Sequence, residues 1–525
     1  VDGAHSLSLF TNGSSNPRVV VNSAGNITVN VTGTVTVGSH AVTNAGTFAV
    51  QAAQSGTWTV QPGNTANTTA WKVDGSAVTQ PVSGTVTANL AAGTNGIVKL
   101  WNAEDGKLVA ELKGDRYAYE LAADGHEVTV IEQHDSVAEE ASFANAGVVA
   151  PGYVTPWASP GMPGKVISHL LSRHSPVRMA WPLSATDMAW IWKWWRACKP
   201  ATYALNRARM QRLAFYSRER LHQLSTELRL EYDRSEGYMV LLRSDKERAM
   251  VEAGLQVLRD AGIDFRTIDA AQARLIEPAL NAEMVFSGAI HLPDDEVANC
   301  RQFASLLKAE AQRLGAEFHF NTTVTRIDSE HPASVHVAGE TAPRRYDAVV
   351  VCAGMASARL LRPLGLRIPM TAVYGYSLTA PVREPLDAPR SGLMDERYKI
   401  SISRIGNRVR VAGSAEIGGS LEHKREASVQ TLYKVLQDWF PGAAQINSGN
   451  TGVQIWKGAR PMLPDGPPVI GSAGTPGLWL NLGHGSSGWA LSCSSARLLA
   501  DMLAGKTPAI DTEGLGLERL IRPVA

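Results

Sequence analysis

The chain changes character sharply after about residue 95, and this discontinuity limits every fold that it can adopt. The sequence has 525 residues, yet the first 95 carry only four charged side chains, Asp2, Arg18, Lys72 and Asp74. Within this stretch, residues 27–37 alternate Ile or Val with Thr and other polar residues. Alternation with period two, interrupted by Gly and Asn, predicts short strands joined by turns. We therefore expect a β-rich extension over residues 1–95, fused to a different kind of chain.

Short repeats recur within this extension at 31–37, 55–60 and 82–87, each built around a Gly-Thr pair. Repeats with polar residues on both faces favour a stacked, fibrous β array over a compact core. Their composition resembles the repeat regions of bacteriophage tail or fibre proteins. A flexible polar extension with aggregation-prone strands explains the same pattern equally well.

The composition of the whole chain excludes several classes of protein. Hydrophobic residues make up 44% and charged residues 19%, which is enough to bury a sizeable core. The net charge of +1 argues against bulk electrostatic capture of nucleic acid, so no nucleic-acid partner is expected. The four cysteines are far apart, which excludes a disulfide scaffold and a structural zinc site and suits a reducing compartment. With no apolar run of about 18 residues and no signal peptide, we expect a cytoplasmic protein.

Residues 115–132 predict the second half of a dinucleotide-binding βαβ unit. A helix at 115–124 ends before Gly125, and an apolar strand then closes on the acid Glu132. An acid in this place accepts hydrogen bonds from a ribose. A surface helix and strand that end in a solvated glutamate account equally well for this segment taken alone.

The first half of that unit, a strand followed by GxGxxG, is missing upstream. Its three glycine positions fall on Val109, Glu111 and Gly114, of which only the last is glycine. The second position must let the backbone approach a pyrophosphate, and a glutamate there adds a side chain and a negative charge. The phosphate cradle is therefore missing or damaged.

A hairpin is expected where that first strand should lie. Residues 97–112 form two apolar arms around a turn at Asp105-Gly106. Either arm, 97–101 or 107–110, is a candidate replacement for the first strand of the unit.

A literal GxGxxG does occur near the end of the chain, at Gly483-His-Gly-Ser-Ser-Gly488. It follows an apolar strand at 478–482 and precedes an apolar helix at 489–503. Backbone N–H groups before a helix stabilise an anionic ligand atom. Because no later strand ends on an acid, we interpret this loop as a second anion-stabilising part of a larger cofactor site.

Seven segments, in this order, resemble the FAD-dependent D-amino acid dehydrogenases, within the wider D-amino acid oxidase and glycine oxidase family. The resemblance covers about residues 114–525. Each segment is weak alone, and their order makes the resemblance specific. They are Gly125–Glu132; Ser142–Gly147 with Pro151-Gly-Tyr153; Val349–Gly354; Tyr374-Gly-Tyr376; Tyr398–Arg404; Gly458–Gly466; and Gly483–Gly488.

The resemblance implies an α/β fold in which a Rossmann-like FAD-binding domain is interleaved with an antiparallel, α+β substrate domain. The expected divisions are the extension at 1–95, a junction hairpin at 96–113, the first FAD-binding part and start of the substrate insert at 114–200, a substrate and helical domain at 201–300, a second FAD-binding part at 301–365, the substrate-domain sheet at 366–455 and a C-terminal FAD-binding part at 456–525.

The resemblance also implies which residues hold FAD. Small residues at 142–147 suit close passage of a flavin. Val324 lies in the strand expected to meet the adenine, with plain core packing as the alternative, and His484 is expected to have a positioning or electrostatic role. No metal ligands are expected, and Cys352 is interpreted as core filler. The cofactor-binding set is Gly114, Glu132, Ser142, Asn145, Ala146, Gly147, Val324, Ala353, Gly354, Arg460, Gly483, His484, Gly485, Ser486, Ser487 and Gly488.

Two arginines are candidates for holding the substrate. A carboxylate matches the planar guanidinium fork, so Arg404 and Arg460 are predicted to bind it. The alternatives are an exposed strand arginine for Arg404 and an ion pair with Asp465 for Arg460. Tyr374, Tyr376 and Tyr398 supply hydroxyl donors and pocket walls, although at least one of them is expected only to pack.

The activity that the resemblance implies is oxidative deamination of D-amino acids to 2-oxo acids and ammonia. Hydride passes to the flavin, and the electrons pass on to a respiratory acceptor such as a quinone. No catalytic acid or base is assigned. Two alternatives remain open: a non-catalytic body that lost its phosphate loop, and a structural fibre protein that acts through residues 1–95.

One further segment concerns the membrane. Residues 181–196 contain five of the 13 tryptophans, beside Lys193, Arg196 and Lys199. Such a segment, Trp181–Trp195, can rest in a membrane interface, which would place the protein peripherally on the inner face of the plasma membrane. A core helix beneath the substrate domain explains the same residues equally well.

Overall fold

The computed structural model describes residues 115–169, 174–331, 333–446 and 452–521, together with the backbone of six strands that precede them. It divides into two compact units, Val1–Gly93 and Thr94–Ala525. In the first unit, two antiparallel pairs are described, β1 (Leu9–Phe10) with β4 (Thr36–Val37) and β2 (Arg18–Val21) with β3 (Ile27–Asn30). The repeats at 55–60 and 82–87 lie outside the described residues.

The second unit contains a sheet in the order β13-β7-β6-β17-β24-β23, the arrangement of a doubly wound nucleotide-binding fold. Its neighbours are parallel except β23 and β24, and β5 adds an antiparallel strand to β6. Val349, Val350 and Val351 of β17 are fully buried, because a parallel sheet is covered on both faces. The strands are β5 (Val98–Asn102), β6 (Gly106–Leu112), β7 (Thr129–Ile131), β13 (Glu317–His319), β17 (Val349–Cys352), β23 (Val469–Ser472) and β24 (Leu478–Leu482).

The second arm of the hairpin takes the place of the first strand of the nucleotide-binding unit. β6 lies between β7 and β17, whereas β5 pairs only along the hairpin. The strand order reverses between β6 and β17, and crevices at such a switch point bind ligands. Val109 and Glu111 are strand residues of β6, and Gly114 lies outside the described residues.

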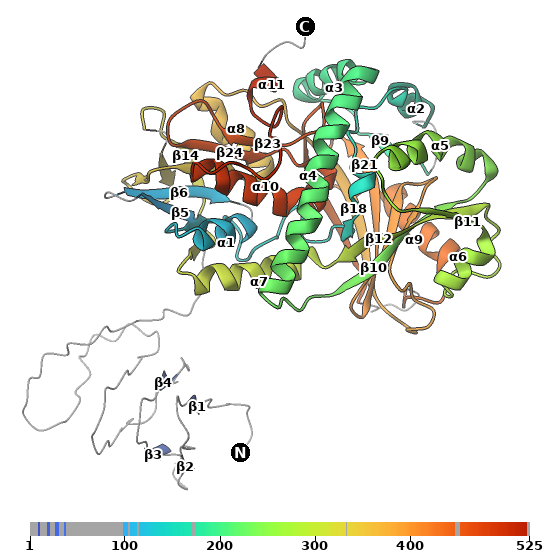
Figure 1. Ribbon diagram of the computed structural model, residues 1–525, viewed down its shortest axis with the longest axis horizontal. Helices are drawn as coiled ribbons and strands as arrows, with labels where there is room; N and C mark the ends of the chain where they lie inside the picture. The colour runs from blue at the N-terminus through green and yellow to red at the C-terminus, as the bar shows by residue number, and fades with distance from the viewer. Residues whose placement is uncertain are drawn as a thin grey trace, which may run out of the picture. The chain divides into compact units, whose positions relative to one another are not determined.

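Helices cover one face of this sheet and a small sheet covers the other (Figure 1). Side chains of α1 (Asp115–Ala123), α4 (Pro200–Glu227), α7 (Cys300–Arg313) and α10 (Gly488–Leu503) share one apolar core with Val350 of β17. The other face packs on β14 (Val324–Ile327), β15 (Ser334–Val337) and α8 (Ser357–Leu361); β16 (Arg344–Arg345) completes the small sheet.

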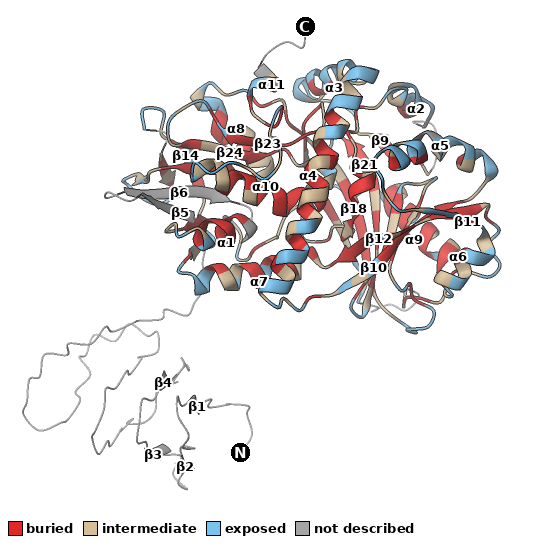
Figure 2. Cartoon of the chain, viewed as in Figure 1, coloured by how far each residue is buried: buried red, intermediate tan, exposed pale blue. Residues whose placement is uncertain are grey.

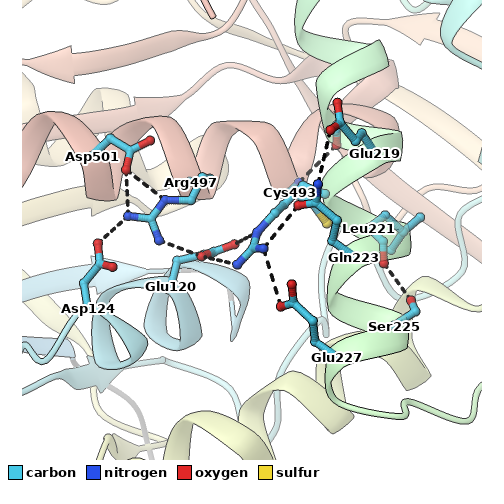
Figure 3. Close-up of polar contacts among 12 residues, drawn as sticks. Glu120, Asp124, Glu219, Leu221, Gln223, Ser225, Glu227, Cys493, Arg497 and Asp501 are labelled. Carbon is cyan, nitrogen blue, oxygen red and sulfur yellow. Dashed lines mark hydrogen bonds and ion pairs between the residues drawn. The ribbon is translucent and has the colours of Figure 1, made fainter. Parts of the chain in front are cut away.

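A buried ion cluster fixes α1 against α4 and α10 (Figure 3). The fully buried carboxylate of Glu120 accepts a hydrogen bond from Arg220 Nε at 2.7 Å and another from Arg497 Nη1 at 2.8 Å. Arg497 also pairs with Asp124 and Asp501. These charges hold the helix whose amino end follows β6.

The second sheet is mixed and mostly antiparallel, in the order β11-β12-β10-β19-β20-β21-β18-β22, with β8 on β12 and β9 on β21. Helix α9 (Glu426–Trp439) packs on one face through the fully buried Trp439. The strands are β8 (Val148–Val149), β9 (Val177–Met179), β10 (Arg234–Leu242), β11 (Arg266–Ile268), β12 (Gly288–Ala298), β18 (Thr371–Pro381), β19 (Gly392–Asp395), β20 (Ile400–Ile405), β21 (Arg408–Ile417) and β22 (Gln454–Met462).

The predicted α/β class, with a Rossmann-like sheet interleaved in sequence with an antiparallel one, is confirmed. Figure 1 shows α4 crossing the body between the two sheets. Its Ser217 hydroxyl accepts from Cys493 N of α10, and its Arg218 pairs with Asp295 of β12 at 3.2 Å. Among the strands whose burial is described, those of both sheets are largely buried (Figure 2). The remaining helices are α2 (Met162–His169), α3 (Ala185–Ala197), α5 (Asp245–Asp260), α6 (Ala270–Ile276) and α11 (Glu518–Ile521).

Candidate functional site

A cleft opens at the carboxyl ends of β7 and β17, beside the switch point of the parallel sheet. Glu132 follows β7 directly and Ala353 follows β17 directly, so both strands deliver a residue to it. Val324, at the start of β14, closes a third side. The full lining is Ile131, Glu132, Gln133, Val324, Ala353, Ala356 and Arg359.

The carboxylate of Glu132 is held in place within this cleft. Its Oε1 accepts the backbone N–H of His134 at 3.0 Å. Its backbone is fixed as well, because Glu132 N donates to His319 O and Thr322 N donates to Glu132 O. A carboxylate held at the end of the second strand is suited to accept ribose hydroxyl groups.

Three of the seven lining residues were predicted from the sequence, namely Glu132, Val324 and Ala353. Arg359 and Ala356 were missed because they lie on the helical turns after Gly354, where no motif marks them. Gly354 itself adopts a left-handed φ of 51°, which turns the chain out of β17 beside the cleft.

The loop at residues 142–147 is tied to the body through three successive carbonyl groups. Asn145 O accepts from Arg410 Nη1 at 3.1 Å, and Ala146 O accepts from Ser403 Oγ at 2.7 Å. Gly147 O accepts from Ala298 N at 2.8 Å and from the indole Nε1 of Trp489 at 3.1 Å.

Gly147 cannot be replaced in this loop without a clash. It has a φ of 76°, and a Cβ atom there would lie 2.8 Å from Ala298 O. Its N–H donates to Asn145 Oδ1 at 2.9 Å. Ser142 lies in the turn that precedes these residues.

The second glycine-rich loop joins β24 to α10 and also depends on its glycines. Gly483 and Gly485 have left-handed φ values of 78° and 58°. Cβ atoms at these positions would lie 2.4 Å from Leu463 Cδ1 and 2.7 Å from Met462 Sδ, respectively. Ser486 and Ser487 complete a short 3₁₀ turn, and α10 begins at Gly488. The loop therefore presents a helix amino end beside β22.

The side chain of His484 is engaged by the following helix. Its Nε2 lies 2.9 Å from Ser495 Oγ of α10. This contact fixes the imidazole, as a residue that positions the cofactor would require. The backbone shape of the loop is set by Gly483 and Gly485.

Arg460 lies on one face of the mixed sheet without a carboxylate partner among the described residues. Its Nη1 donates to Ser414 O at 2.8 Å, and burial lowers the pKa of the guanidinium to about 10. The ion pair considered with Asp465 does not form, because Asp465 pairs with Arg519 at 2.8 Å. A partly buried guanidinium that is bonded only to a carbonyl can accept a bidentate carboxylate ligand.

Strand alternation places the tyrosines of β18 on the opposite face. Val373 pairs with Arg460 across β18 and β22, whereas Tyr374 pairs with Ala459, and paired residues share a face. Gly375 returns to the Arg460 face, where a Cβ atom would collide with the guanidinium.

The tyrosines of β18 join a separate polar network. The fully buried Tyr376 donates to Glu416 Oε2, and Lys457 bonds the other oxygen of Glu416 at 3.2 Å. Burial and the Glu416 bond raise the pKa of Tyr376. Tyr374 reaches Gly419 O at 3.5 Å, and Lys457 Nζ lies 4.5 Å from the centre of its ring.

The structure does not bring Arg404 or Tyr398 to Arg460. Arg404 donates to Gly406 O at 3.2 Å and to Pro385 O at 3.3 Å, and two strands separate β20 from β22. The ring of Tyr398 lies under the guanidinium of Arg243 at 5.0 Å.

The face that carries Arg460 holds a second arginine that sequence reasoning missed. Arg410 pairs with Thr379 and with Ser403 in the sheet register, which places it on the same face as Gly375 and Arg460. Its Nε donates to Thr379 Oγ1 at 3.0 Å, and burial lowers the pKa of its guanidinium to about 10. Only the pairing of β20, β21 and β18 identifies it.

Comparison with known families gives one match over most of the chain. Residues 117–502 match the model of the FAD dependent oxidoreductase family, DAO. The D-amino acid dehydrogenase of Bradyrhizobium diazoefficiens is 41% identical over 404 residues, which cover 77% of this chain and 95% of that protein. The D-amino acid dehydrogenase of Cereibacter sphaeroides (strain ATCC 17029 / ATH 2.4.9) is 40% identical over 418 residues, covering 79% and 95%.

Solved structures share the fold at low sequence identity. Glycine oxidase from Geobacillus kaustophilus superposes with a TM-score of 0.59 at 21% identity, over 77% of this chain and 95% of that one. L-proline dehydrogenase from P. horikoshii gives a TM-score of 0.60 at 16% identity, over 79% and 98%. At these identities the likeness concerns the fold alone.

Proposed function

Because this chain belongs to the FAD dependent oxidoreductase family, we propose that it deaminates D-amino acids oxidatively, forming 2-oxo acids and ammonia. The D-amino acid dehydrogenases that it resembles at about 40% identity favour this activity over a non-catalytic body and over a fibre protein. The geometric observation that carries the proposal is Arg460, a partly buried cation without a carboxylate partner among the described residues.

The described residues fit FAD. Glu132, Val324 and Ala353 would receive the adenosine end in the cleft, with Arg359 at its rim. The 142–147 loop and the Gly483–Gly488 turn would hold the flavin end, since both approach the sheet face closely enough to require glycine. When bound, FAD supplies the two-electron acceptor that takes hydride from the amino acid Cα.

The chain contributes orientation more than acid–base chemistry. Arg460 would fix the substrate carboxylate through its fork and so limit which face of Cα is presented. Arg404 lies on the other face of the sheet and the Tyr376 hydroxyl is engaged by Glu416, so we assign the carboxylate to Arg460.

An absorption spectrum of the purified, desalted full-length protein tests this function. The protein should carry oxidised flavin bands that bleach on anaerobic addition of D-alanine and persist with L-alanine. Arg460→Met should keep the flavin bands and lose the bleaching at low D-alanine concentrations. A protein that remains colourless after incubation with FAD would overturn the catalytic proposal.

We also propose a quinone-type electron acceptor and peripheral membrane contact through α3, on the cytoplasmic face of the plasma membrane. Trp190 and Trp194 of this helix are buried, whereas Trp192 and Trp195 are 57% and 52% exposed, and Trp181 just before it is 78% exposed. Figure 2 shows much of α3 as exposed. Exposed tryptophans beside Lys193 and Arg196 suit an anionic lipid interface. In the part of the chain that the structure describes, no helix is long and apolar enough to cross a membrane.

Sedimentation with lipid vesicles tests the contact. The protein should pellet with vesicles containing anionic lipid and less with zwitterionic vesicles. The double change Trp192→Ser and Trp195→Ser should weaken pelleting at least fivefold without loss of flavin. Equal pelleting of the double variant would remove α3 from the proposal.

A further inference from the structure

The loop at residues 142–147 is held in an unusual way, because its last three carbonyl groups are all engaged by remote elements. Arg410 of β21, Ser403 of β20 and Trp489 of α10 donate to Asn145 O, Ala146 O and Gly147 O in turn. These three hydrogen bonds fix the orientation of the peptide planes at residues 145–147, because each peptide carries its N–H opposite its C=O.

The fixed peptides leave donors in the loop. Gly147 N is bonded to Asn145 Oδ1, whereas the N–H groups of Asn145 and Ala146 have no acceptor among the residues that the structure describes. Backbone donors without a partner in a partly buried loop are costly unless a ligand or water receives them. The loop therefore presents N–H groups to whatever occupies the space beside it.

Arg410 brings a charge as well as a hydrogen bond to this loop. It forms no ion pair with any described carboxylate, and it bonds only the Thr379 hydroxyl and the Asn145 carbonyl. Burial, together with the neighbouring cations Arg408 and Arg301, lowers the pKa of its guanidinium.

Arg301 also lies beside the loop, where it pairs with the carboxylate of Glu139. Its guanidinium lies 4.3 Å from the ring centre of Phe143, the second residue of the loop. Because Glu139 balances Arg301, the uncompensated positive charge beside residues 142–147 is that of Arg410, and a partly buried charge in low dielectric is screened weakly.

We propose that Arg410 is the positioning residue of the flavin: it sets the direction of the 142–147 N–H groups and supplies a fixed positive charge that favours the reduced cofactor. This inference rests on the proposed function. Reduction by hydride adds negative charge to the flavin, so a nearby fixed cation stabilises the reduced form more than the oxidised form. On the same face of the sheet, Arg460 binds the substrate carboxylate and Arg410 positions the cofactor.

Two variants of the full-length flavoprotein separate the charge from the hydrogen bonds. Arg410→Gln removes the charge, and Arg410→Lys keeps the charge but cannot bond Asn145 O and Thr379 Oγ1 with the same planar fork. The midpoint potential is measured by equilibration with reference dyes, and FAD affinity is measured by fluorescence during release.

Arg410→Gln should lower the ratio of reduced to oxidised flavin at least tenfold at a fixed dye potential, which is about 30 mV for two electrons. Arg410→Lys should change the ratio of reduced to oxidised flavin less than threefold at the same dye potential. It should weaken FAD binding at least fivefold. The matched control is Arg408→Gln on the same strand, whose Nη2 bonds Gly452 O at 3.1 Å, and it should change both quantities less than threefold.

The outcomes distinguish this inference from the proposed function. Wild-type potential and FAD affinity in Arg410→Gln, with bleaching by D-alanine intact, would overturn the role of Arg410 alone. If the glutamine variant does not fold, a lysine variant with wild-type FAD affinity would overturn the positioning role. A wild-type protein that binds no FAD would overturn both.

Discussion

Two strand-to-helix joints of the parallel sheet differ in construction although both face the cofactor crevice. β6 ends at Leu112 and α1 begins at Asp115, so two residues join them. β24 ends at Leu482 and α10 begins at Gly488, so five residues join them, including Gly483 and Gly485. The first joint occupies the central position of the fold with only the last of its three expected glycines, and the second has a full glycine-rich loop after β24.

The two helices are positioned by different forces. The second joint is shaped by its own backbone. Its left-handed glycines leave no room for a Cβ atom beside Leu463 and Met462. Helix α1 is instead held by side chains of two remote helices, through Glu120, Arg220 and Arg497 (Figure 3). An ion cluster can thus fix a helix direction, while only glycine backbone lets a ligand approach closely.

The largest effect should follow from breaking the ion cluster beneath α1. Glu120→Gln removes the buried carboxylate that faces both Arg220 and Arg497, and removal of one partner from a buried ion pair costs about 3–5 kcal/mol. The free energy of unfolding in urea, measured for the full chain, should fall by about that amount. FAD affinity should fall with it, because α1 loses its direction.

Glu227→Gln is the matched control for this change. Glu227 also faces Arg220, but at 3.7 Å and with a side chain 57% exposed. Such an exposed pair contributes about 0–1 kcal/mol, so the variant should unfold nearly as the wild type does. Equal losses in the two variants would show that burial of the cluster is not what holds α1.

The second joint should respond to a single methyl group. Gly483→Ala places a Cβ atom 2.4 Å from Leu463 Cδ1 at a φ of 78°, and strain with overpacking should cost about 2–3 kcal/mol. Thermal unfolding and flavin content should both report the loss. Gly505→Ala, with a φ of 67° and open space around its Cβ position, isolates the backbone cost of about 1–2 kcal/mol.

Much of the cofactor half could be predicted because its signals are local in sequence. The helix and strand at 115–132 predicted Glu132 at the end of β7, and the structure places it in the cleft. The segments Val349–Gly354 and Gly483–Gly488 lie at adjacent strand ends, since parallel neighbours bring their carboxyl ends to one edge. No pattern marks Arg359, because its helix is short and follows the motif.

The residues on the substrate-binding face of the mixed sheet could not be predicted from the sequence. Alternation along one strand does not tell which face a side chain shares with the next strand until their pairing is known. Tyr374 and Arg460 stand in neighbouring strands, yet the register sends them to opposite faces. In the sequence, Arg410 is only one of several arginines in strands. Its pairing with Ser403 and Thr379 is what places it over the 142–147 loop. The sequence gives the residue type at each position. The face of the sheet on which a strand side chain lies depends on the pairing register with strands that are remote in sequence.

A smaller effect concerns the acid end of the pH range and tests the outer part of the α1 cluster. Although burial opposes it, hydrogen bonds from Arg497 and Lys506 hold the pKa of Asp124 below its usual value. A lowered pKa in the folded state gives stability that is present above the unfolded pKa of about 4 and is lost as pH falls through the folded value. Between pH 5 and pH 3 the wild type should therefore lose more unfolding free energy than Asp124→Asn, by up to about 1 kcal/mol.

The smallest expected effect separates side chain from backbone at the second joint. Ser495→Ala removes the hydroxyl that lies 2.9 Å from His484 Nε2 and that donates to Leu491 O at 2.7 Å. Loss of such bonds costs about 1 kcal/mol of unfolding free energy, but the φ values of Gly483 and Gly485 do not depend on them. FAD affinity should then stay within twofold of wild type while Gly483→Ala loses flavin. If Ser495→Ala releases flavin as readily as Gly483→Ala, the loop is shaped by its histidine, and both joints would depend on side-chain contacts with a following helix.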